Sequence, residues 1–304
     1  MDAAMEELWK KFHLSEEEKG VLVVSSQEVA LSKDHAQLSI LFKLQSIKDF
    51  NKEAFKSTIQ KLWRGLHGVT IKEVGSNLFL AIFVREEDMK KVLDKSPWSF
   101  DRKLILLKRF HEDLSPGNVA FQYSPFWIRV FNIPIKSINK VVGTCTVKET
   151  GVPLLVDAPK SGLAWGPFLR IRVNIDITKP LMRGKMIHIE DMEEGWVFFK
   201  YERLPTFCYR CGILCHQDRE CQRINEGCLH TDEDEFQFGP WMRVIAPKIN
   251  QKKGSPNQPR SRDDEEEVSL VTEGEENIDG PSKLRQQQLH IQMVSESIMK
   301  ICRQ

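Results

Sequence analysis

The sequence predicts an α+β protein with a zinc knuckle in its C-terminal half and a disordered tail after it. Three observations support this fold class. Short segments of alternating hydrophobicity are interleaved with segments of helical periodicity over most of the chain. Four cysteines and one histidine, all metal-type ligands, then fall within the stretch CYRCGILCHQDREC at residues 208–221. Finally, residues 263–279 contain nine acidic and no basic side chains, a composition that does not support a packed core.

The first 30 residues predict a short helix followed by a strand. Apolar residues recur at the spacing of one helical face between Met5 and Phe12. The run VLVV at 21–24 has the β-branched composition of a strand. We therefore interpret 1–30 as an N-terminal helix and strand.

Residues 31–112 predict a domain with the element order βαββαβ. Alternating apolar residues around Ile40 predict the first strand, and the helical stripe through Ile59 predicts the first helix. VTIKEV and LFLAIFV, separated by GSN, predict a β-hairpin. A second helix around Val92 ends before Pro97, and LILLKRF predicts the last strand. This order is the split βαβ pattern of ferredoxin-like and RNA-recognition folds.

Aromatic side chains of the third strand raise the question of base stacking in this domain. Phe79, Ala81 and Phe83 share one face of LFLAIFV, where RNA-recognition folds place stacking rings. The segment lacks the Lys/Arg-Gly-aromatic opening of that motif. We therefore favour packing in the core, or contact with protein, over stacking on bases.

A second, small α+β unit is predicted at 120–203. FWIRVFNIP begins this unit as a strand, and a helix passes through Val141 and Cys145. FLRIRVNIDI alternates, so that its apolar residues share one face while Arg170 and Arg172 share the other. Two more strands lead to the cysteines, and no internal repeat is evident in the sequence.

The spacing Cys208-x2-Cys211-x4-His216-x4-Cys221 is that of a CCHC zinc knuckle, which we place at 204–225. Zn²⁺ prefers four such ligands in a tetrahedron, and two cysteines separated by two residues bend around one ion. Because all four ligands come from the protein, no position is left for water. We therefore expect one structural Zn²⁺, on which local folding depends.

Neighbouring residues leave alternatives for the ligand set. Cys215 precedes His216, so an all-cysteine shell is the alternative, and Cys228 and His230 are further spare ligands. We favour His216 because it completes the standard knuckle. Cys215 also stands before the histidine, where a glycine usually permits a tight turn, so we expect strain or weaker metal binding there.

With the cysteines placed, the chain resembles plant LINE-type retrotransposon-derived proteins in which a domain of unknown function precedes a CCHC zinc knuckle. The knuckle itself is similar to those of retroviral nucleocapsid and retroelement proteins. The resemblance spans about residues 1–245 and rests on FNKEAFKSTIQKLWR, NLFLAIFVREEDMKKVLDKSPWSFDRKLILLKRF, FWIRVFNIPI, FLRIRVNIDITKPLMRG, FKYERLPTFCYRCGILCHQDREC and FGPWMR. It implies the non-enzymatic, nucleic-acid-binding half of such an element, or a plant gene descended from one. Cys215 departs from the family's pattern.

A knuckle of this kind implies single-stranded RNA or DNA as the partner. An aromatic ring stacks on unpaired bases and basic groups contact phosphates. The candidate residues are Tyr209, Arg210, Arg219 and Arg223 in and near the knuckle, with Arg170 and Arg172 as a basic track on the second unit. Plain packing is the alternative for the tyrosine, and a solvated surface is the alternative for the arginines.

Two other functions compete with this one. A protein-interaction adaptor with a structural zinc knuckle is favoured by the acidic tail and by Cys215. A zinc-dependent deaminase is suggested by HIE at 188–190 followed by PTFCYRC. In that interpretation the proline is not adjacent to Cys208, and His216 and Cys221 have no role. No phosphate-binding loop or nucleophile constellation is present, so we predict no catalytic residue and no enzyme.

The remaining features concern partners and location. The chain has 44 Lys and Arg against 43 Asp and Glu, so its net charge does not indicate a partner. It has no run of about 18 apolar residues and no signal-peptide pattern, and four of its seven cysteines cluster. We expect no membrane contact and an intracellular location, in the nucleus or cytoplasm. Residues 246–304 are predicted as a disordered acidic tail. Its Leu284, Ile291 and Ile298 have the spacing of a partner-binding helix, but we favour a frayed end because the pattern covers barely three turns.

Overall fold

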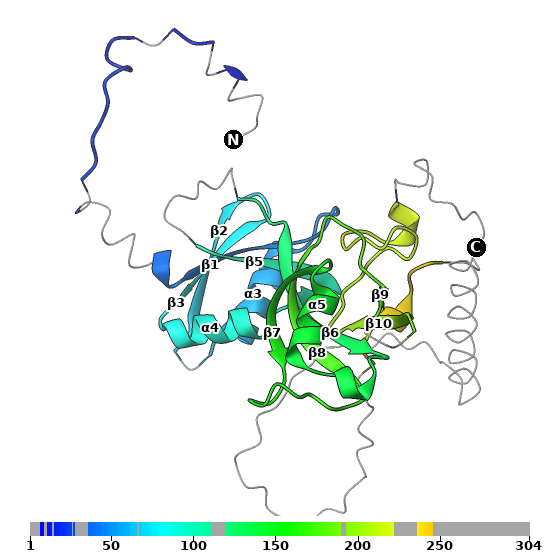
Figure 1. Cartoon of the computed structure of the whole chain (residues 1–304). Helices are drawn as coiled ribbons and strands as arrows, with labels where there is room; N and C mark the ends of the chain where they lie inside the picture. Colours follow the sequence, from blue (N-terminus) through cyan, green and yellow to red (C-terminus); the bar gives the residue numbers. More distant parts are fainter. Residues whose placement is uncertain are drawn as a thin grey trace, which may run out of the picture. The chain divides into compact units, whose positions relative to one another are not determined.

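The computed structural model describes residues 7–8, 11–13, 15–25, 27, 36–65, 67–110, 119–189, 193–221 and 236–245. Within these residues the protein is mixed α+β, with two five-stranded antiparallel sheets and few helices (Figure 1). Both sheets belong to one compact unit that extends to Val244. None of the helices in the described ranges has the length and apolar content that crossing a membrane requires. The predicted tail at 246–304 lies outside the described residues.

The first sheet has the strand order β2-β3-β1-β5-β4, and every neighbouring pair is antiparallel. The predicted order of strands and helices is present, with one short extra strand, β4, before the last strand. The elements are β1 (Ser39–Leu44), α3 (Lys52–Trp63), β2 (Val69–Gly75), β3 (Leu78–Phe83), α4 (Glu86–Asp94), β4 (Trp98–Phe100) and β5 (Lys103–Arg109).

Aromatic rings between the helices and the first sheet form the first core. The ring of Phe42 on β1 lies 4.9 Å from that of Trp63 on α3 and 5.4 Å from that of Phe79 on β3, measured between centroids. Ala81 and Phe83 are buried in the same cluster. The aromatic side chains of β3 therefore pack in the core, as the sequence favoured, and do not form an open stacking surface.

The other face of the first sheet is also partly covered. On β5, Ile105 lies in the first core. Its neighbours Leu104 and Leu106 point to the opposite face of the sheet and belong to the second core. On β1, the ammonium of Lys43 lies 5.2 Å from the ring centroid of Phe121. The face that RNA-recognition domains use for bases is thus partly occupied by the chain itself.

The second sheet has the strand order β7-β8-β6-β10-β9, again antiparallel throughout. The inward residues of β6, β8 and β10 are buried, and the residues between them are half-buried or exposed. The elements are β6 (Tyr123–Phe131), η2 (Ile135–Ser137), α5 (Lys140–Val147), β7 (Gly151–Asp157), β8 (Leu169–Asp176), β9 (Gly184–Ile187) and β10 (Gly195–Tyr201).

The two sheets repeat one strand order. Strands β6, β7, β8, β9 and β10 occupy the places that β1, β2, β3, β4 and β5 occupy in the first sheet. Helix α5 follows β6 as α3 follows β1, whereas residues 177–183, between β8 and β9, contain no helix equivalent to α4. No internal repeat is evident in the sequence, although the topology is repeated, because the same arrangement is built from different side chains.

Knuckle residues complete the second core. Phe207 and Leu214 are 2% and 1% exposed, and they belong to the same cluster as the inward side chains of β6, β8 and β10. The backbone N–H of Leu181 donates to the carbonyl of Gly212 at 2.9 Å. Two short helices follow, η3 (Asp218–Glu220) and η6 (Pro240–Met242), and Met242 also lies in this core. The knuckle is therefore packed into the second unit.

One predicted strand is absent from the residues that the structure describes, and two strands of the structure were not predicted. No strand forms at 21–24, where Val21 and Leu22 are each 87% exposed and no described strand pairs with them. Apolar composition does not stabilise a strand that has no partner. Strands β4 and β7 were not predicted, because β4 has only three residues and β7 contains Pro153 without a clear alternation.

Candidate zinc centre and nucleic-acid interface

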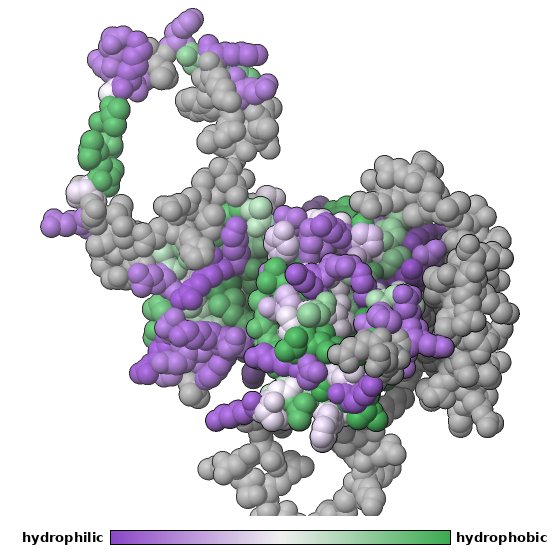
Figure 2. Space-filling model, in the orientation of Figure 1, coloured by the Kyte–Doolittle hydropathy of each residue, from purple (hydrophilic) through white to green (hydrophobic). Residues whose placement is uncertain are grey.

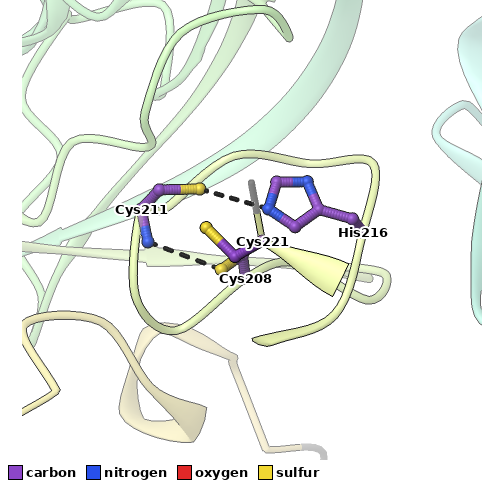
Figure 3. A group of neighbouring side chains, drawn as sticks. All are labelled: Cys208, Cys211, His216 and Cys221. Atoms are coloured by element: carbon purple, nitrogen blue, oxygen red, sulfur yellow. Dashed lines mark hydrogen bonds between the residues drawn. The ribbon is translucent and has the colours of Figure 1, made fainter. Parts of the chain in front are cut away.

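The four predicted metal ligands converge in one place. The Sγ atoms of Cys208, Cys211 and Cys221 and a ring nitrogen of His216 all lie within 4.8 Å of one another (Figure 3). The cysteines are buried and the histidine is half-buried. In a tetrahedral zinc site with bonds of about 2.3 Å, ligand atoms lie about 3.8 Å apart, so this group needs only a small contraction.

The backbone of the first loop explains how two cysteines reach the same point. The carbonyl of Cys208 accepts from the N–H of Gly212 at 2.9 Å, and the carbonyl of Ile213 accepts from the N–H of Cys208 at 3.0 Å. Gly212 has φ +74°, and a Cβ there would lie 2.5 Å from the ring of Phe238. A glycine is therefore required by both the turn and the packing.

Cys215 lies outside the converging group and contacts the far side of the histidine. Its Sγ is 2.9 Å from Nδ1 of His216, while Nε2 of that ring lies 3.4 Å from Sγ of Cys211. The predicted strain is not present, because Cys215 is not among the described residues with positive φ. The glycine that this loop needs stands at 212, three residues earlier.

The chemistry of the group fits Zn²⁺. Burial raises the pKa of the Cys208 and Cys211 thiols, so without a cation both sulfurs favour the protonated form. A divalent cation reverses this preference and binds them as thiolates. This is a CCHC zinc knuckle whose three cysteines and one histidine hold one structural zinc ion.

Polar contacts fix the second half of the knuckle. The side chains of Gln217 and Glu220 form a reciprocal capping box around η3. The carboxylate of Asp218 accepts from the N–H of Tyr209, which joins the two loops. Lys48 pairs with Glu220 at 2.5 Å and links the knuckle to the segment after β1.

Tyr209 is held by intramolecular contacts. Its hydroxyl accepts from Nη1 of Arg243 at 2.8 Å, and its ring lies 5.0 Å from that of Phe207 and 6.5 Å from that of Phe236. The ring is half-buried. Neighbouring Arg210 lies over Phe236 at 5.5 Å, and its Nε is buried with no hydrogen-bond partner among the described residues. A role for either residue in binding nucleic acid stays a prediction.

The other predicted contacts differ in accessibility. Arg219 is exposed on η3, and Arg223 lies outside the described residues. Arg170 donates to Glu202 from Nε at 3.0 Å and from Nη2 at 2.8 Å, and it lies 3.9 Å from the ring centroid of Trp127. These contacts make Arg170 part of a side-chain network.

Arg172 joins the second sheet to the end of helix α4 in the first domain. Its Nη2 donates to the carbonyl of Leu93 at 2.8 Å and to the hydroxyl of Ser96 at 2.9 Å. Burial lowers the pKa of its guanidinium. A contact of Arg172 with phosphate stays a prediction, but these bonds place it in a half-buried interface.

Arg243 belongs to the stretch FGPWMR and has a structural role that the sequence did not indicate. Its guanidinium donates to the carbonyls of Leu204 and Pro205 at 3.2 and 2.9 Å, and lies 4.9 Å from the ring of Phe207. Arg243 thus anchors the segment that enters the knuckle. A lone arginine two residues after a tryptophan gives no sequence signal for this role.

Comparison with known proteins supports this organisation. Residues 33–118 match the model of the family described as "Domain of unknown function (DUF4283)", and residues 175–223 match the family "Zinc knuckle". An uncharacterized protein of Arabidopsis thaliana is 23% identical over 134 residues, which cover 44% of this chain and 42% of that protein. The chain thus matches less than half of the length of this relative. The architecture is a domain of unknown function followed by a CCHC zinc knuckle.

Proposed function

We propose that this protein binds single-stranded RNA or DNA, without catalysing a reaction, and that its zinc ion is structural. The observation that carries the proposal is the group of three cysteines and one histidine at knuckle spacing, within a segment similar to known zinc knuckles. Zinc knuckles are a common module for single-stranded nucleic acid. Four protein ligands leave no position for a reactive water, which supports a non-catalytic role.

The first domain supports the same class of function by its topology. Its strand order β2-β3-β1-β5 is compatible with the ferredoxin-like or RNA-recognition arrangement that the sequence predicted. Because its free face is partly covered by Phe121 and by the second core, we assign binding to the second unit and the knuckle.

We further propose an origin in a plant LINE-type retroelement and action in the nucleus or cytoplasm. The order of the two matched domains and the Arabidopsis relative support the origin. The clustered thiols of the knuckle favour a reducing compartment.

A protein-interaction adaptor is the second candidate. One observation favours it: the ring of Tyr209 is packed against Phe207 and its hydroxyl is bonded to Arg243, so the most obvious stacking ring of the knuckle is already engaged. In this case the tail at 246–304 would contact a protein partner. The deaminase alternative is disfavoured, because His188 is not in the converging group.

The test is a binding titration with the zinc-loaded full chain. Fluorescence anisotropy of labelled single-stranded RNA and DNA is measured at low and high salt. We expect binding at low salt that weakens as salt rises, because phosphate contacts release counterions. If the zinc-loaded protein has no affinity for either strand at low salt, the adaptor replaces this proposal.

A further inference from the structure

The outer face of the second sheet carries aromatic and basic side chains in ordered rows. Along β6, β8 and β10 the buried residues alternate with half-buried ones that lie on the opposite face. Helix α5 packs on the buried face, where a Cβ at Gly143 would lie 2.3 Å from Leu169. The half-buried residues therefore lie on the face that α5 does not cover.

Strand register aligns these residues across the sheet. Phe198 of β10 lies opposite Phe131 of β6, whose ring is 5.3 Å from that of Phe168, just before β8. Two residues along β6, Arg129 lies opposite both Lys200 of β10 and Arg170 of β8. A row of three phenylalanines thus runs beside a row of three cations.

Cation–π contacts join the two rows. The guanidinium of Arg129 lies 4.5 Å from the ring centroid of Phe168, and the ammonium of Lys200 lies 5.4 Å from that of Phe131. The side chains of Arg129 and Arg170 keep 30% and 32% of their surface exposed. The rows are therefore ordered by contacts within the protein and remain accessible to a ligand.

The charge of this face is positive and only partly neutralised. Glu202 pairs with Arg129 at 2.6 Å and with Arg170 at 2.8 Å, and Asp157 at the sheet edge also pairs with Arg170. Burial alone would raise the pKa of Glu202, but the bonds from the two arginines outweigh it and lower the pKa, so the carboxylate is charged. Lys200 has no carboxylate partner among the described residues.

We propose that this face, with its rows Phe198–Phe131–Phe168 and Lys200–Arg129–Arg170, is the main binding surface for single-stranded nucleic acid. The inference rests on the proposed function and names its site. Unpaired bases stack on aromatic rings and on arginine planes, and the adjacent cations contact phosphates. The corresponding face of the first sheet carries the buried Leu41, Leu104 and Leu106 and offers no such rows.

A partner protein fits this face less well. Lysine is depleted in the core of protein interfaces, so the position of Lys200 within these rows is unfavourable for a protein partner. A phosphate backbone matches both the excess of positive charge and the flat array of rings. We therefore assign the surface to a nucleic acid.

The test compares variants of this face with matched controls in the zinc-loaded full chain. Phe131→Ala and Phe168→Ala should each weaken binding of single strands by about 5-fold or more, since one base stack contributes about 1–3 kcal/mol. Lys200→Gln should reduce the slope of log affinity against log salt by about 0.7. The controls are Phe121→Ala, another cation–π ring off this face, and Lys148→Gln at the end of α5, and both should bind like wild type.

Ultraviolet crosslinking gives a second readout that needs no substitution. The wild-type protein should crosslink to single strands through peptides that contain β6, β8 or β10. If the wild type binds but the Phe131, Phe168 and Lys200 variants bind equally well, or crosslinks fall only in the knuckle, this inference is wrong and the proposed function stands. If the wild type binds no single strand, both are wrong.

Discussion

The sulfur of Cys215 lies 2.9 Å from Nδ1 of His216, while Nε2 of the same ring lies 3.4 Å from the sulfur of Cys211. The histidine therefore presents Nε2 to the three buried cysteines and Nδ1 to Cys215. A zinc-binding histidine commonly donates from its second nitrogen to a carboxylate, a backbone carbonyl or water, which orients the ring, and here Cys215 occupies that place. Cys215 is therefore not one of the four zinc ligands but supports one of them, His216.

The first prediction separates the roles of these residues. Cys211→Ser should abolish stoichiometric zinc, because it removes a buried ligand, whereas Cys215→Ser should retain one zinc per chain with affinity reduced by about 10- to 100-fold. Metal content and competition with a chelator are the measurements. If Cys215→Ser loses zinc while His216→Ala keeps it, the shell is built from cysteines alone.

The second prediction concerns coupling between the zinc site and the second core. Because Phe207 and Leu214 are buried among the side chains of β6, β8 and β10, removal of zinc should expose more than the knuckle. Amide hydrogen exchange should speed up in β10 and η6 on chelation, and much less in β1 and α3. Unchanged exchange in β10 would show that the knuckle and the sheet are independent.

A third prediction tests the same packing without a change of metal ligands. Leu214→Ala should lower the free energy of unfolding by about 2–5 kcal/mol, the range for a fully buried leucine. Denaturant unfolding with zinc present is the measurement. Leu163→Ala is the matched control, since Leu163 is 45% exposed and should change stability little. Equal effects of the two substitutions would contradict the core position of Leu214.

The fourth prediction concerns pH and a buried carboxylate in the first domain. Asp88 is 3% exposed and lies 2.9 Å from Nδ1 of His67. The hydrogen bond with His67 outweighs burial and lowers the pKa of Asp88. A carboxyl group whose pKa is lowered by folding stabilises the folded state at pH values above its ordinary pKa of about 3.9. This stabilisation is lost as the pH falls through the lowered pKa of the folded state.

Asp88→Asn should therefore destabilise the protein at neutral pH, with a difference from wild type that shrinks below about pH 4. Denaturant midpoints measured across pH are the test, and the exposed Asp49→Asn is the control. A difference that stays constant from neutral to acid pH would contradict the assignment.

The sequence predicted secondary structure best where hydrophobic residues recur with a clear local period. The alternation in FLRIRVNIDI matches β8, and the helical stripe through Ile59 matches α3. The convergence of the four zinc ligands could also be predicted, because their spacing within one short segment is a local signal. Long-range contacts left no such signal: Arg172 reaches a carbonyl 79 residues away, and Arg243 reaches Tyr209 across 34 residues. The repeated strand order was missed for the same reason, since pairing between distant strands depends on tertiary packing.

Competition between a single strand and a duplex of the same sequence, both offered to the zinc-loaded full chain, tests binding through unpaired bases. We predict that the single strand, RNA or DNA, binds more tightly at every salt concentration, because paired bases cannot reach aromatic rings. The difference should persist at high salt, where phosphate contacts are screened and stacking remains. Equal affinity for duplex and single strand would contradict the account, as would no affinity for either.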